Sequence, residues 1–78
     1  MTLLQYVENN SSPADLEITD FAGQPTLCER LHEMGLHRGQ SIRTVGRAPL
    51  RGPLLIQFGT SLLALRAEEA ACTLIKVP

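Results

Sequence analysis

The chain has 78 residues, of which 44% are hydrophobic and only 4% aromatic, and its formal net charge is −1. So short a chain cannot assemble a second hydrophobic core, and we expect residues 1–78 to form one domain. It has no apolar run near the roughly 20 residues of a membrane span and no signal-peptide pattern at its N-terminus, so we expect a cytoplasmic protein. Basic side chains outnumber acidic ones only after residue 37, and a chain that is slightly acidic overall is not expected to bind nucleic acid.

The first 21 residues predict a short apolar segment followed by a strand. Residues 3–7, LLQYV, are expected to cover one end of the core, and the turn-forming sequence NNSSP comes before the strand. Within residues 14–21, ADLEITDF, Leu16 and Ile18 alternate with polar side chains. This is the period of a strand with one buried face.

A short helix is predicted from Pro25 onwards, because the apolar period changes there. Its apolar stripe consists of Leu27, Cys28, Leu31 and Met34. Proline suits the first turn of a helix, where its missing N–H would be unpaired anyway. Gly35 is expected to take a positive φ and Leu36 to fold back onto the last turn, which ends the helix at Met34 or Gly35.

Four further strands are predicted after the turn at Gly39. Residues 40–48 alternate, with Ile42 and Thr44 on one face, until the sequence APLRGP (residues 48–53) breaks the strand. Residues 54–58 and 61–66 read as a hairpin, residues 67–70 as one helical turn, and residues 72–77 as the closing strand. Five short strands in so small a chain are expected to close into a barrel, because closure removes exposed edges.

The ordered motifs RLHEMGLHRGQSIRTV, APLRGPLLIQF and LALRAEEA resemble the FeoA family of small ferrous-iron transport proteins. The positions that match the family pattern are Leu31, Met34, Gly35, Leu36, Gly39, Ala48, Pro49, Leu50, Pro53, Ala64, Leu65 and Arg66. The resemblance implies a mainly β fold with a short helix, a small SH3-like β-barrel of about five strands. The family is also similar to a domain at the end of some iron-dependent repressors.

The resemblance also implies a function. Family members are non-enzymatic cytosolic accessory proteins that act beside a ferrous-iron permease (FeoB), a membrane protein with its own GTP-binding domain. The expected partner is therefore the cytosolic domain of that permease, and the chain would meet the membrane only through it. Weak association between copies of the chain is left open.

The predicted docking surface is the proline-stiffened loop, which would lose little entropy on binding. Its residues are Arg47, Ala48, Pro49, Leu50, Arg51 and Pro53, with the turn from Leu36 to Gly39 as a secondary surface. The other interpretation is that the two prolines only shape a corner between strands. Arg51 and Gly52 stand where the family commonly has Gly-Asp, so a cation replaces a carboxylate.

The segment CERLHEMGLHRG has the composition of a metal site, but we expect none. Cys28 and His32 are four residues apart on one helix, so Glu29 or His37 could complete a shell. However, Cys28 also belongs to the apolar stripe, and the turn at Gly35 is expected to direct His37 away from His32. We therefore expect no metal or other cofactor, and we expect Cys28 and Cys72 to be free thiols.

Other functions have less support from the sequence. Neither cysteine lies in a nucleophile motif, and neighbouring Glu68 and Glu69 would point about 100° apart on a helical turn, so no enzyme is expected. An RNA-binding barrel needs exposed aromatic rings, which this chain largely lacks. A metal-responsive regulatory domain that senses divalent iron is the nearer alternative, and it would be stabilised by the metal.

Overall fold

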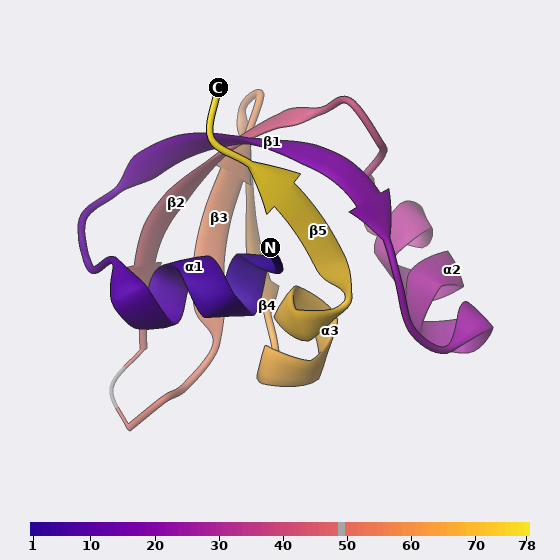
Figure 1. The fold of residues 1–78 in the computed structure, drawn as a ribbon, viewed down its shortest axis with the longest axis horizontal. Helices are drawn as coiled ribbons and strands as arrows, with labels where there is room; N and C mark the ends of the chain where they lie inside the picture. The colour runs from indigo at the N-terminus through magenta and orange to yellow at the C-terminus, as the bar shows by residue number, and fades with distance from the viewer. Residues whose placement is uncertain (49) are drawn as a thin grey trace.

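The computed structural model describes residues 1–48 and 50–78, so Pro49 lies outside the described residues. The elements follow the order α1 (Leu3–Asn9), β1 (Ala14–Phe21), α2 (Pro25–Glu33), β2 (Ser41–Arg47), β3 (Leu54–Phe58), β4 (Ser61–Leu65), α3 (Ala67–Ala71) and β5 (Thr73–Lys76). The five strands form one antiparallel sheet in the order β4-β3-β2-β1-β5 (Figure 1). The mainly β, SH3-like fold predicted from the sequence is thereby confirmed.

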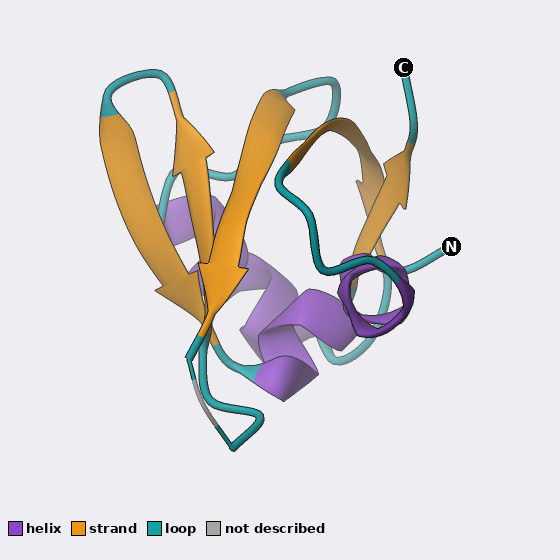
Figure 2. Cartoon of the chain, turned by 90° about the vertical axis from the view of Figure 1, so that its left-hand side faces the viewer, coloured by secondary structure: helices purple, strands orange, loops and turns teal. Residues whose placement is uncertain are grey.

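The expected closure of the sheet is wrong. Among the described residues, β4 and β5 lie at the two ends of the strand order and do not pair with each other. The sheet curves around helices α1 and α3, which contact each other (Figure 2). Helices thus cover the core where a closed barrel would have a strand pair. The outer edge of β5 is partly covered by a bridge from Thr2 to Leu74, and among the described residues the outer edge of β4 has no strand partner.

Strand β1 holds the sheet together because it has two partners. Its first half, from Ala14 to Glu17, pairs with β2, and its second half, from Glu17 to Phe21, pairs with β5. The register with β5 shifts between Ile18 and Asp20. An irregularity of this kind bends a strand, which suits β1 to the curvature of the sheet in Figure 1.

One cluster of buried aliphatic side chains fills the space between sheet and helices. Its members are Leu3, Leu16, Ile18, Leu31, Leu36, Ile42, Leu54, Ile56, Leu65, Ala70 and Ile75. The predicted alternation is confirmed in β1 and β2, whose inward residues are the buried ones, and β3 shows the same pattern. Each fully buried Leu or Ile contributes about 1.5–3 kcal/mol by leaving water.

The N-terminal segment covers one end of the core as expected, and it does so as a helix. The Gln5 N–H donates to Thr2 Oγ1 at 3.1 Å, and the Thr2 N–H donates to Gln5 Oε1 at 2.9 Å. This reciprocal capping box satisfies N–H groups that a helix start leaves unpaired. Leu3, directly inside the cap, is fully buried.

Helix α2 ends at Glu33, one residue before the predicted end at Met34 or Gly35, and its ending has the predicted form. Gly35 has φ 102°, its N–H donates to the His32 carbonyl at 3.0 Å, and the Leu36 N–H donates to the Leu31 carbonyl at 3.1 Å. These two bonds form a Schellman motif, in which the residue with positive φ is usually glycine. Leu36 is fully buried and returns the chain to the core.

Candidate protein-binding site

The β2–β3 loop is closed across its base by backbone hydrogen bonds. The Ala48 N–H donates to the Pro53 carbonyl at 3.0 Å, and the Gly52 N–H donates to the Ala48 carbonyl at 3.2 Å. Arg47 adds a side-chain bond, because its Nε–H donates to the Gly52 carbonyl at 3.2 Å. The loop therefore has a fixed base before any partner arrives.

The tip of the loop carries an exposed apolar side chain on an unfavourable backbone. Leu50 has φ 59° and Arg51 has φ 58°, and both side chains are exposed. The relative exposure of Leu50 is 101%, so it contributes nothing to the core. A residue other than glycine costs about 1–2 kcal/mol in the left-handed region. Two such residues in succession at a loop tip are an outlier of the kind that clusters at binding sites.

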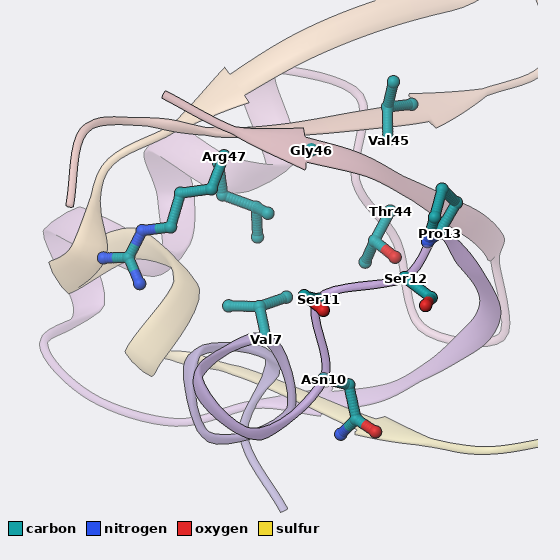
Figure 3. A pocket seen from close by; sticks show the side chains of 10 residues that line it. Val7, Asn10, Ser11, Ser12, Pro13, Thr44, Val45, Gly46 and Arg47 are labelled. Carbon is teal, nitrogen blue, oxygen red and sulfur yellow. The ribbon is translucent and has the colours of Figure 1, made fainter. Parts of the chain in front are cut away.

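A pocket of about 230 Å³ lies beside the base of the loop (Figure 3). Its walls come from the end of α1, the segment 10–13 that follows it, and the rim of β2 and β3. Figure 3 shows Val7 on one wall, and it shows Arg47 extending along one side of the pocket. The pocket therefore has walls of mixed polarity, in which the hydroxyl and amide groups of segment 10–13 face apolar side chains such as Val7 and Leu54, and Arg47 adds a cation.

The charge of Arg47 is not neutralised within the described part of the chain. The ion pairs formed there join Arg38 to Asp20, Arg43 to Asp15 and Lys76 to Glu17, at 3.9, 3.0 and 3.7 Å. Arg47 is half-buried, and only its Nε has a hydrogen-bond partner among these residues. Its two Nη groups can therefore bind a carboxylate from outside the chain.

The structure does not unite the two surfaces predicted for docking. Leu36 is fully buried, which removes its side chain from any docking surface, and Gly39 is exposed with φ 83°. The turn from Leu36 to Gly39 precedes β2, whereas the loop follows β2, so the two lie at opposite ends of that strand. Sequence reasoning also missed the pocket, because its walls come from segments far apart in the chain.

The segment around Cys28 contains no cluster that could complete a metal site from its own side chains. Within the described residues, no group of three or more His, Cys, Asp and Glu side chains is placed to hold a metal ion. The expected direction of His37 is wrong, however. The rings of His32 and His37 lie 6.0 Å apart between centroids, because the Schellman turn reverses the chain beside the last turn of α2.

Cys28 and Cys72 are both free and half-buried, as predicted. Burial raises the pKa of the Cys72 thiol, and the neighbouring Cys28 raises it further. A raised pKa keeps Cys72 protonated at neutral pH and therefore a poor nucleophile. This thiol fits a structural role beside Gly23, where an added Cβ would come within 2.6 Å of its sulfur.

Comparison with known proteins gives a consistent result. The FeoA domain family model matches residues 12–77. An FeoA-like protein from Clostridium acetobutylicum has a TM-score of 0.85 at 22% identity, over 99% of this chain and 85% of that one. Iron(II) transport protein A from Clostridium thermocellum has a TM-score of 0.82 at 28% identity, over 99% of this chain and 45% of that one. No curated protein matches the sequence significantly.

A third structure shares the fold alone. ScaR with bound Zn²⁺ has a TM-score of 0.84 at 17% identity, over 100% of this chain and 37% of that one. The chain therefore corresponds to about a third of that larger protein.

In the part of the chain that the structure describes, no helix is both long and apolar enough to cross a membrane.

Proposed function

The chain belongs to the FeoA family, and on that premise we propose that it is a non-enzymatic cytoplasmic accessory protein that binds the cytosolic domain of a ferrous-iron permease. Family membership connects the chain with ferrous-iron transport, as does its similarity to an iron(II) transport protein. We further propose that the chain acts in transport through one partner, the permease, whose transport or GTP cycle it modulates when bound.

The exposure of Leu50 is the observation that carries the proposed docking surface. The loop holds this side chain away from the core on a closed base, between the cations of Arg47 and Arg51. Because the base is already ordered, docking costs less conformational entropy than the ordering of a free loop would. Burial of Leu50 in a partner contributes about 1.5–3 kcal/mol, which is the size of an interface hot spot.

The chemistry of the loop also indicates which groups the binding surface of the partner must provide. The partner surface has an apolar recess for Leu50 and carboxylates within reach of Arg47 and Arg51. Carboxylates at the rim raise the association rate and fix orientation more than they raise affinity. Binding is therefore expected to weaken with ionic strength while keeping an apolar component.

A double substitution, Leu50→Asp with Arg51→Glu, tests the loop. We expect at least a tenfold loss of affinity in a titration against the cytosolic domain of the permease, since the change removes the apolar anchor and reverses a charge. Aspartate is among the residues that tolerate the left-handed backbone of Leu50, so the loop should keep its shape.

Leu62→Asp provides the matched control. Leu62 is 66% exposed and lies in β4 next to the hairpin turn, at the end of β3 remote from the loop. This variant should bind normally. Normal binding and normal iron uptake by the double variant would rule out the loop as the docking surface.

A metal-responsive regulatory domain is the second candidate, favoured by the fold shared with ScaR, whose structure contains bound Zn²⁺. Such a domain would melt at a higher temperature with ferrous ion than with a chelator, because ligand binding to the folded state stabilises it. A docking module should melt at the same temperature in both when His32 and His37, the two histidines of the chain, are replaced by glutamine. Thermal unfolding under anaerobic conditions distinguishes the two.

A further inference from the structure

We propose that His32 and His37 form an open two-histidine site for a borderline divalent cation such as Zn²⁺, at the junction of α2 with the turn before β2. The two rings are 6.0 Å apart between centroids, with an interplanar angle of 63°. Two imidazoles on one tetrahedral ion, with metal–nitrogen bonds of about 2.0 Å, have ring centres about 5 Å apart. A small rotation of the exposed His37 side chain would bring both rings onto a common ion.

The hydrogen bond of His32 prepares the ring for this role. Its Nδ1 lies 2.7 Å from the Cys28 carbonyl oxygen. A carbonyl oxygen only accepts, so the neutral ring carries its proton on Nδ1 and leaves the lone pair on Nε2 free. Metal-binding histidines usually donate their second ring nitrogen to a carbonyl or carboxylate in the same way, which fixes tautomer and orientation.

A second contact holds the His32 ring in place. Phe21, at the end of β1, lies 4.9 Å from it between centroids in a tilted arrangement. Phe21 is half-buried against the core. The ring of His32 is thus fixed by one hydrogen bond and one aromatic contact, so less ordering is required when an ion binds.

The surroundings determine which ions the site accepts. No third His, Cys, Asp or Glu in the described part of the chain completes the pair, so water is expected to fill the remaining positions. The nearby cation of Arg38 is 3.9 Å from the Asp20 carboxylate, which offsets its repulsion of a metal. Two imidazoles and water favour Zn²⁺ over Mn²⁺ in the usual order of stability for divalent metals.

The chain has only two histidines, which makes the test direct. We would titrate the protein with Zn²⁺ alone and follow the ring protons of both histidines by NMR. They are expected to shift together, with one common midpoint and a fitted stoichiometry of one Zn²⁺ per chain. Two independent midpoints, or no shift, would overturn the proposal.

Substitutions identify the ligands. His32→Gln and His37→Gln should each lower Zn²⁺ affinity about tenfold or more, since even loss of an outer hydrogen bond to a metal ligand costs 10–100-fold. Cys28→Ser and Cys72→Ser should leave the affinity unchanged. Retained affinity in His37→Gln, or loss in either cysteine variant, would contradict the histidine pair.

A measurement without metal tests the prepared tautomer. Nitrogen–proton correlation spectra of the His32 ring should place the proton on Nδ1. A proton on Nε2 in the metal-free protein would remove the basis of the proposal. The proposal does not depend on the β2–β3 loop, and failure of either leaves the other standing.

Discussion

At the scale of single residues, the backbone of the loop tip is more informative than its sequence. Leu50 and Arg51 both have positive φ values, which residues other than glycine, asparagine and aspartate rarely adopt. The folded state tolerates the conformational free energy of these two residues because hydrogen bonds fix the base of the loop. We infer that stability is given up here to present a leucine and an arginine to a partner.

Arg51→Gly is expected to raise the free energy of unfolding by up to about 1 kcal/mol relative to Arg51→Ala. Glycine removes the left-handed strain of about 1–2 kcal/mol, and its greater freedom in the unfolded chain offsets part of that gain. Urea unfolding of the two variants measures the difference. Equal stability would mean that the backbone at Arg51 is not strained.

At the scale of elements, the end of α2 is fixed by local chemistry. Gly35 takes φ 102° in the Schellman motif, and an added Cβ would lie 3.4 Å from the Phe58 ring. Gly39 also has positive φ, but nothing lies within 4 Å of its added Cβ. The two glycines therefore share the backbone requirement and differ in packing.

Gly35→Ala should destabilise the fold by more than Gly39→Ala. Both substitutions carry a left-handed cost of about 1 kcal/mol or more, and this cost is larger at Gly35, because its φ of 102° lies further from the narrow left-handed region open to other residues than the 83° of Gly39. The Phe58 ring adds no penalty, since the added Cβ would meet it at an ordinary contact distance. Thermal unfolding of the two variants provides the comparison. A larger loss in Gly39→Ala would contradict this order of backbone costs.

The elements that the sequence predicted well are those with local signals. Alternation around Leu16 and Ile18 and the glycine at position 35 each act within a few residues, and the structure confirms them. The approach of His37 to His32 is not predicted, although the turn at Gly35 is, because the position of His37 beside the helix depends on how far the chain reverses after Leu36. The start of α1 also has a local signal, the capping box formed by Thr2 and Gln5. Alternation and composition alone do not reveal it.

At the scale of the whole molecule, the open sheet could not be predicted from the pattern. Periodicity identifies strands and their buried faces, but it does not say which strand lies at an edge. Whether β4 meets β5 depends on how α1 and α3 pack, which is decided by contacts between distant segments. The pocket beside Arg47 has the same origin, since Val7 and residues 10–13 form it together with residues 44–47 and Leu54.

The free edge of β4 predicts weak association between copies of the chain. Strand β4 carries no charge, and its Leu62 is 66% exposed, so it lacks the usual protection of an edge strand. Leu62→Lys should reduce association at high concentration in sedimentation velocity. Val45→Lys is the matched control, because Val45 is 41% exposed but lies on the central strand β2. Equal suppression by both would point away from the β4 edge.

The contacts of the N-terminus affect how the protein folds during synthesis. The Ile75 N–H donates to the Met1 carbonyl at 2.9 Å, and Thr2 bridges to Leu74, so the first residues are held by the last strand. The second half of β1 also lacks its partner until residues 73–76 have left the ribosome. Contacts between such distant positions must wait for loop closure. In a growing chain, the sheet therefore becomes whole only after residues 73–76 have emerged.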